Sequence, residues 1–121
     1  MKNSLSLTVI ILLFLVSPTF AGEADVLNVQ VSKSGTRTYK FDVTISHNDT
    51  GWEHYANKWD ILDDKEGILG TRILHHPHVD EQPFTRSLSG VVIPKSIKTV
   101  TIRAHDSVHE YGGKVVNVKL P

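Results

Sequence analysis

The sequence predicts an all-β fold, a sandwich of seven short strands. Apolar and polar residues alternate with the two-residue period of strands through residues 27–120, and turn-forming residues interrupt them. No segment has a convincing helical periodicity. Turn signals at intervals of about 8–12 residues favour a sandwich of the immunoglobulin or fibronectin type III kind, with a small open barrel as the alternative.

The first two strands carry the clearest alternation. Leu27, Val29 and Val31 alternate with polar residues in the first strand. Four apolar residues alternate with polar ones between Tyr39 and Ile45, which predicts a half-buried strand. The turn between these two strands is rich in lysine, serine and glycine, as turns usually are.

The five later strands are separated by polar or glycine-rich turns. Trp59 and Ile61 are expected to point inward from the third strand, and a buried tryptophan there suits a sandwich. Gly90 predicts a bulge or a close backbone approach in the fifth strand. These strands are expected at residues 55–62, 68–74, 84–93, 99–104 and 115–120.

Residues 1–21 predict a secretory signal peptide. Lys2 gives a positive start, residues 5–16 form an apolar run, and Ala21 ends a small-x-small cleavage site. The run is shorter than the about 20 apolar residues that a membrane span needs. We therefore expect residues 22–121 to be a single domain in the periplasm or secreted, and not membrane-spanning after cleavage.

The amino-acid composition argues against sulfur chemistry and against nucleic-acid binding. The sequence has no cysteine, and Met1 is its one methionine, so disulfides, thiolate catalysis and sulfur ligands are not expected. Lys and Arg total 13 and Asp and Glu total 13, with no basic stripe, which argues against nucleic-acid binding.

All seven histidines lie in three windows, residues 47–54, 75–82 and 105–112. Each window follows a predicted strand. The corresponding connections of a seven-stranded sandwich share one end. The topology therefore predicts that the imidazoles gather at one pole, and imidazole is the commonest protein ligand for metal ions.

The second and third windows hold most of the predicted ligands. An extended chain before Pro77 would turn His76 and His78 the same way, so that both could grip one ion, with His75 pointing away. His105 and His109 are four residues apart and could converge if Asp106 caps a single turn. The alternative ligands or orienting groups are His75, Asp80, Glu81 and Asp106.

The first window supplies His54 as a predicted ligand. His47 continues the inward face of its strand, so it either caps the core or supports the site. Three aromatic residues beside this pole form either the end of the core or a ligand surface: Trp52, Tyr55 and Tyr111. Arg86 is expected to pair with Asp80 or Glu81, or else to belong to that surface.

The predicted metal ligands are thus His54, His76, His78, His105 and His109. Imidazole and carboxylate without sulfur suit a divalent ion such as Zn(II) or Cu(II), and sequence does not choose between them. The spacing matches no zinc-finger pattern and no His-Glu-x-x-His helix.

Several runs resemble small, exported, uncharacterised bacterial proteins. They are Gly51-Trp52-Glu53-His54-Tyr55, the stretch from His76 to Arg86, and Arg103-Ala104-His105-Asp106. The resemblance implies an envelope setting and no mechanism. A small exported sandwich with histidines is also similar in architecture to periplasmic copper-resistance proteins, although this chain lacks their methionine-rich segments.

These observations predict a periplasmic carrier, buffer or sensor of divalent metal, which is not an enzyme and whose other partner could be an envelope protein. The alternative is a module that binds a protein, peptide or sugar through the same loops. A zinc hydrolase with Glu81 or Glu110 as base is a third possibility, for which a 100-residue domain offers little pocket wall.

Overall fold

The computed structural model describes residues 22–121. The predicted signal peptide, residues 1–21, lies outside the described residues. The described part contains no helix that is long and apolar enough to cross a membrane. It forms seven strands: β1 (Asp25–Lys33), β2 (Thr38–Ser46), β3 (Ala56–Leu62), β4 (Ile68–Ile73), β5 (Phe84–Val92), β6 (Thr99–Asp106) and β7 (Val116–Lys119).

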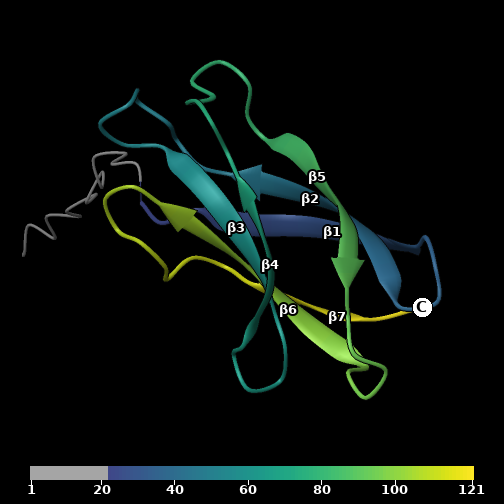
Figure 1. Ribbon diagram of the computed structural model, residues 1–121. Coiled ribbons are helices and arrows are strands. Elements are labelled where there is room, and N and C mark those ends of the chain that lie inside the picture. Colours follow the sequence, from purple (N-terminus) through teal and green to yellow (C-terminus); the bar gives the residue numbers. More distant parts are fainter. Residues whose placement is uncertain (1–21) are drawn as a thin grey trace, which may run out of the picture.

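These strands make two antiparallel sheets, which confirms the predicted all-β fold with seven strands. One sheet has the order β1-β2-β5, and the other has the order β4-β3-β6-β7. The two sheets pack face to face, with β1 against β6 and β7 and with β4 against β5 (Figure 1).

The core lies between the sheets and follows from the alternation of the strands. On β2, Phe41, Val43 and Ile45 are all fully buried, and polar residues between them face outward. Trp59 and Ile61 of β3 are fully buried, as predicted. Burying each such side chain contributes about 1.5–3 kcal/mol, so these alternating positions specify which face of each sheet turns inward.

Two irregularities adjust the register of the three-stranded sheet. The pairing of β1 with β2 shifts between Val26 and Asn28, so Val26 is buried while Leu27 is 44% exposed. Leu27 therefore does not share the inward face with Val29, because the extra residue of a bulge reverses the alternation on one side of it. The bulge predicted at Gly90 is present, with a positive φ of 68° where the pairing of β5 with β2 shifts.

The strand connections divide between the two ends of the molecule. The β2–β3, β4–β5 and β6–β7 connections gather at one end, and the other three connections lie at the opposite end (Figure 1). The three histidine windows belong to the first group. The first end is called the histidine pole here.

Candidate metal site at the histidine pole

Asp49 fastens the loops of the histidine pole to one another. Its Oδ1 accepts a hydrogen bond from the backbone N–H of Ala56 at 3.0 Å and another from the ring of His47. Its Oδ2 accepts one from the backbone N–H of His78 at 2.7 Å. Burial alone would raise the pKa of Asp49, but these three donors and the charge on His47 lower it below its ordinary value. Asp49 therefore stays ionised in a buried position.

His47 is a buried cation. Its Nδ1 faces the Asp49 carboxylate, and its Nε2 lies 2.8 Å from the carbonyl oxygen of Gly22. Both neighbours are acceptors at neutral pH, so both ring nitrogens must carry protons. Burial alone would lower the pKa of His47, but the hydrogen bond and charge of Asp49 outweigh it and raise the pKa. The expectation that His47 points inward is confirmed by its 3% exposure.

Asp106 faces this cation from the end of β6. Its Oδ1 accepts hydrogen bonds from the backbone N–H groups of Val108 at 2.8 Å and His109 at 2.6 Å. Its Oδ2 is buried, has no hydrogen-bond partner among residues 22–121, and lies 3.9 Å from Nε2 of His47. Burial alone would raise the pKa of Asp106, but the two backbone donors and the charges of His47 and His109 lower it. Asp106 thus caps the turn, as predicted, and still has an oxygen with free lone pairs.

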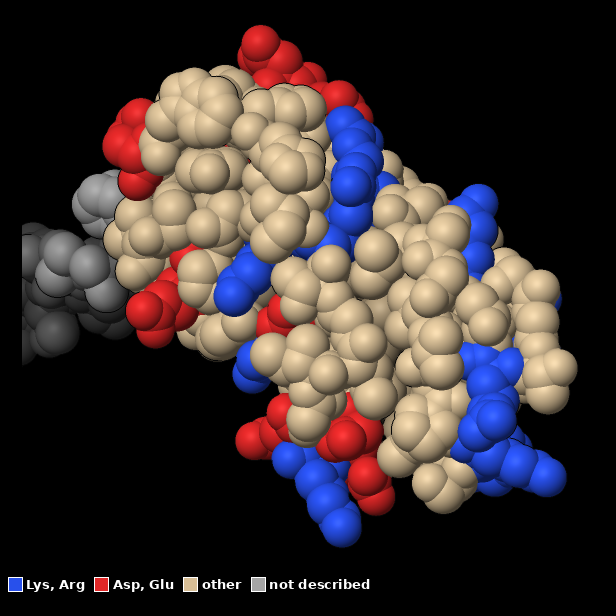
Figure 2. Space-filling model, viewed as in Figure 1, with Lys and Arg blue, Asp and Glu red and all other residues tan. Residues whose placement is uncertain are grey.

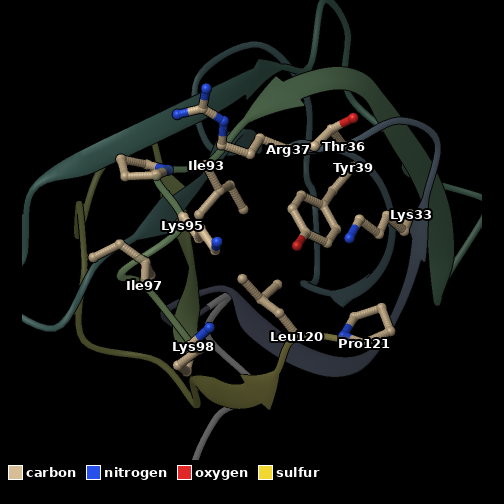
Figure 3. Close-up of a pocket in the computed structure, with 11 residues that line it drawn as sticks. Lys33, Thr36, Arg37, Tyr39, Ile93, Lys95, Ile97, Lys98, Leu120 and Pro121 are labelled. Atoms are coloured by element: carbon tan, nitrogen blue, oxygen red, sulfur yellow. The ribbon is translucent and has the colours of Figure 1, made fainter.

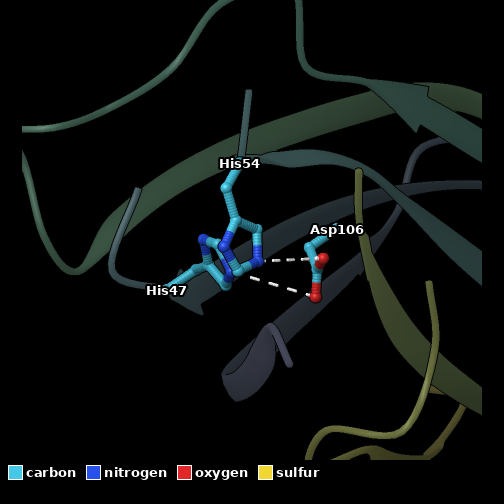
Figure 4. A group of neighbouring side chains, drawn as sticks. All are labelled: His47, His54 and Asp106. Atoms are coloured by element: carbon cyan, nitrogen blue, oxygen red, sulfur yellow. Dashed lines mark ion pairs between the residues drawn. The ribbon is translucent and has the colours of Figure 1, made fainter. Parts of the chain in front are cut away.

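His54 and His109 meet at this carboxylate from two different loops. Nε2 of His54 lies 3.2 Å from Oδ1 of Asp106 and 3.2 Å from Nδ1 of His109. Nδ1 of His109 lies 3.5 Å from the same Oδ1. Figure 4 shows His54 and His47 both turned toward Asp106. We call the set His47, His54, Asp106 and His109 the His–Asp cluster.

The donor atoms of this cluster are spaced as metal ligands would be. Those of His47, His54 and Asp106 all lie within 4.8 Å of one another. In a tetrahedral site with bonds of about 2.0–2.1 Å, neighbouring ligand atoms lie about 3.3–3.4 Å apart. The triangle of His54, His109 and Asp106 has edges of 3.2, 3.2 and 3.5 Å. His47 has no lone pair to offer a metal ion, because its ring nitrogens face Asp49 and the carbonyl oxygen of Gly22, so it is a charged neighbour of the triangle.

The second window forms a separate pair. The rings of His76 and His78 have centroids 4.5 Å apart, but Nε2 of His78 lies 3.0 Å from a guanidinium nitrogen of Arg86. A guanidinium can only donate, so Nε2 of His78 is an acceptor that is already in use. His78 also stacks on Phe84 with centroids 3.9 Å apart. The sequence predicted that His76 and His78 could bind one ion together. The prediction is wrong, because the two rings do not aim two free nitrogens at a common point.

This arrangement predicts that Arg86→Gln raises the pKa of His78. Burial and then the charge of Arg86 lower that pKa from its ordinary value of 6.5, with a smaller lowering by His76, while Glu81 and Asp49 oppose them. Removing the guanidinium leaves burial as the main cause, so the pKa should move back toward 6.5. NMR titration of the ring protons measures it. Lys40→Gln, which removes a cation near the far end of β2, should leave the pKa unchanged, and an equal shift in both variants would contradict the assignment.

His105 lies on the outer face of the four-stranded sheet. Its Nδ1 donates to Oδ1 of Asn57 at 2.6 Å, and its ring packs edge-on against Tyr111 with centroids 4.7 Å apart. Burial and then the charge of Lys58 lower the pKa of His105, so it is neutral. His105 points out of the core, and its neighbours are different from those of His54 and His109.

Tyr111 also belongs to a polar network on that face. Its hydroxyl donates to Oδ2 of Asp60 at 2.7 Å, and the Arg103 guanidinium lies 3.7 Å from its ring centre. Asp60 is fully buried and accepts further bonds from Arg103 at 3.1 Å and from the hydroxyl of Thr71 at 2.7 Å. Burial alone would raise the pKa of Asp60, but these three donors and the charge of Arg103 lower it. Tyr111 therefore joins the β6–β7 connection to the sheet.

The other predicted residues lie at the surface of the pole. Trp52 is 67% exposed and packs edge-on against Tyr55 with centroids 5.6 Å apart. Glu81 pairs with Arg86 at 3.3 Å. His75 and Asp80 are exposed.

Sequence reasoning missed two residues that organise the pole. Neither Asp49 nor Asn57 was among the predicted site residues. The sequence did hold one indication for Asp49. It lies two residues after His47, which was expected to point inward, and at that spacing a carboxylate can accept a hydrogen bond from the histidine Nδ1. No pattern pointed to Asn57, because its contact with His105 spans two strands that are distant in sequence.

No protein-family model matches the chain, and no solved structure matches it. The chain is similar to a protein of Halomicrobium mukohataei named "Putative lipoprotein", with 38% identity over 96 residues. The match covers 79% of this chain and 47% of that protein. The chain therefore spans about half the length of the curated relative that it matches.

Proposed function

We propose that this protein binds a divalent transition-metal ion at the His–Asp cluster, as an exported carrier, buffer or sensor and not as an enzyme. The ligands are His54, His109 and Asp106. His47 stands behind them with Asp49, which fixes its ring and its charge.

The single observation that carries the proposal is the triangle of donor atoms from these three ligands. Its edges of 3.2, 3.2 and 3.5 Å match one face of a tetrahedral site. The Asp106 carboxylate adds the negative charge that a divalent ion favours, and its buried Oδ2 has no hydrogen-bond partner among residues 22–121. His109 is 38% exposed at its side chain, so an ion has a path from solvent.

The donor set favours Zn(II) or Cu(II). Two imidazoles and a carboxylate suit both ions, and the absence of cysteine disfavours soft Cu(I). His76, His78 and His105, which the sequence also suggested, lie outside the proposed ligand set because Arg86 and Asn57 already engage two of their rings.

Location and fold class are part of the same proposal. The signal-like residues 1–21 and a relative named as a lipoprotein support export, and we place the protein in the periplasm or outside the cell. The order of the strands, three in one sheet and four in the other, supports an immunoglobulin or fibronectin type III sandwich. The architectural similarity to copper-resistance proteins adds Cu(II) to the ions worth testing.

Calorimetric titration of tag-free protein with Zn(II) and with Cu(II) tests the proposal. At least one ion should bind at one site with a Kd well below about 1 mM. His54→Gln and His109→Gln should each weaken binding about 100-fold, because the loss of orienting groups alone commonly costs 10–100-fold. Binding weaker than millimolar for both ions would refute the proposal.

His105→Gln is the matched control. Like the two ligand variants, it removes one imidazole. The new glutamine amide can still donate to Asn57, and position 105 lies on the outer face of the four-stranded sheet. Its metal affinity should equal that of the wild type. If His105→Gln and His54→Gln lose affinity equally, the ion does not sit in the proposed triangle.

A second candidate function is a module that binds a protein, peptide or sugar. The exposed Trp52, braced by Tyr55, supports it, because exposed aromatic residues often anchor such contacts. Trp52→Ala should abolish partner capture and leave metal affinity unchanged. Capture that requires metal would instead join the two functions.

The proposal of a non-enzymatic role has its own test. A zinc hydrolase would use the open fourth position of the ion to activate water, with Glu81 or Glu110 as the candidate base. Zinc-loaded protein should not turn over ester or phosphoester substrates. Turnover that is lost in His54→Gln would replace the carrier role with a catalytic one.

A further inference from the structure

A second concave site lies at the end opposite the histidine pole. A cavity of about 690 Å³ opens between the sheets there, within the size range of small-molecule sites. Its walls come from the β1–β2 turn, the β5–β6 connection and the end of the chain. The lining includes the apolar side chains of Tyr39, Ile93 and Leu120 and the cationic side chains of Lys33, Lys95 and Lys98.

The floor of this cavity is apolar. Tyr39 is 8% exposed and Ile93 is 1% exposed, and both belong to the core cluster, against which Ile97 and Leu120 also pack. In Figure 3 the Tyr39 phenol and the Leu120 side chain point into the hollow. An apolar group that entered here would contact the same residues that close this end of the core.

The rim is rich in cationic side chains. Four lining residues are cations, Lys33, Arg37, Lys95 and Lys98, and no lining residue has an acidic side chain. None of the four forms an ion pair with an acidic side chain of residues 22–121. Figure 2 shows Lys and Arg gathered at this end of the molecule. Cations that converge on a concave surface raise the local concentration of anions.

Backbone hydrogen bonds hold the walls in place. The N–H of Ile93 donates to the carbonyl oxygen of Arg37 at 2.9 Å, which joins the β1–β2 turn to the end of β5. The N–H of Leu120 donates to the carbonyl oxygen of Lys98 at 2.9 Å. The cavity is therefore preformed, and a ligand would not need to order its walls.

We infer that this cavity binds a small amphiphilic organic anion. The apolar body of the ligand lies on Tyr39, Ile93 and Leu120. Its carboxylate, sulfonate or phosphate group meets the lysines of the rim. The inference is independent of the metal proposal, because no residue of the His–Asp cluster lines the cavity.

Fluorescence titration with 8-anilinonaphthalene-1-sulfonate tests it on the folded protein. The dye should bind saturably at one site with a blue-shifted emission. The uncharged analogue N-phenyl-1-naphthylamine should bind about tenfold more weakly, and added salt should weaken only the anionic dye. Equal affinity for the two dyes, or no saturable binding, would overturn the inference.

Matched triple variants locate the site. Dye binding should weaken about tenfold in a triple variant that removes three rim cations, Lys33→Gln, Lys95→Gln and Lys98→Gln. Lys40→Gln, Lys65→Gln and Lys114→Gln together remove the same charge outside the cavity and should have no effect. If the two triple variants lost dye affinity equally, the loss would reflect the net charge of the protein, and the inference would be overturned. All six lysines are exposed, so both proteins should unfold at the wild-type temperature.

Two further arms identify the source of the anion. Free decanoate should displace the dye, which supports a soluble amphiphile as the ligand. Displacement by phosphatidylglycerol vesicles but not by decanoate would instead assign the cavity to a membrane surface and overturn the inference of a small ligand. His54→Gln should bind the dye normally, so failure of the metal proposal would leave this result unchanged.

Discussion

Replacing Asp60 by asparagine is expected to lower the free energy of unfolding by about 3 kcal/mol. Asp60 is fully buried, and its two oxygens accept hydrogen bonds from Thr71, Tyr111 and Arg103. An asparagine amide would put an NH2 group where one carboxylate oxygen now accepts, and it would leave the Arg103 charge without its anionic partner. Urea unfolding followed by tryptophan fluorescence measures the difference.

The size of this effect should depend on pH in one direction. Folding lowers the pKa of Asp60 below its ordinary value of 3.8, through the hydrogen bonds of Thr71, Tyr111 and Arg103, which together outweigh burial. A carboxylate whose pKa is lowered on folding stabilises the protein above that ordinary value and loses the contribution as pH falls through the folded-state pKa. The difference between wild type and Asp60→Asn should therefore be constant from pH 5 to 7 and shrink below about pH 3.8.

Asp42→Asn is the control for this prediction. Asp42 also lies in the middle of a strand and accepts a hydrogen bond from Ser87, but it faces solvent and pairs with the exposed Lys40 at 3.8 Å. Exposed pairs contribute little, so its loss should cost less than about 1 kcal/mol. An Asp60→Asn variant that is no less stable than Asp42→Asn would show that the Asp60 network does not hold the β6–β7 connection.

The strands were predictable because each carries a local signal. The alternation between Tyr39 and Ile45 determines which face of β2 is buried, and the pairing of β2 with its neighbours follows from that face. The error at Leu27 arose because a bulge is a property of two paired strands. The glycine at position 90 signalled its bulge, since glycine readily takes a positive φ, whereas Val26 and Asn28 gave no such signal.

The site was predictable in its location but only in part in its membership. Topology alone brought His54 and His109 together, although 55 residues separate them in sequence. It could not separate them from His76, His78 and His105, because that separation depends on which side chains compete for each ring. Arg86 and Asn57 decide the competition through contacts between loops and strands that no local pattern records.

Replacing Asp106 by asparagine is expected to raise the Kd for Zn(II) about 100-fold while the fold is retained. The remaining Oδ1 can still accept from the N–H groups of Val108 and His109, so the turn that carries His109 should persist. The asparagine keeps an oxygen at the Oδ1 corner of the triangle but removes the negative charge of the carboxylate. A neutral amide oxygen is a much weaker ligand for a divalent ion than a carboxylate.

Zinc-dependent stability measures this effect without a labelled ligand. At a free Zn(II) concentration of 100 times the wild-type Kd, binding should add about 2.7 kcal/mol to the free energy of unfolding of the wild type, and about 0.4 kcal/mol to that of a variant that binds 100-fold more weakly. Asp80→Asn, which neutralises an exposed carboxylate of the second window, should keep the full wild-type gain. If Asp106→Asn also kept the full zinc-dependent gain in stability, zinc would not bind in the triangle. The contact between His54 and His109 would then be a hydrogen bond alone.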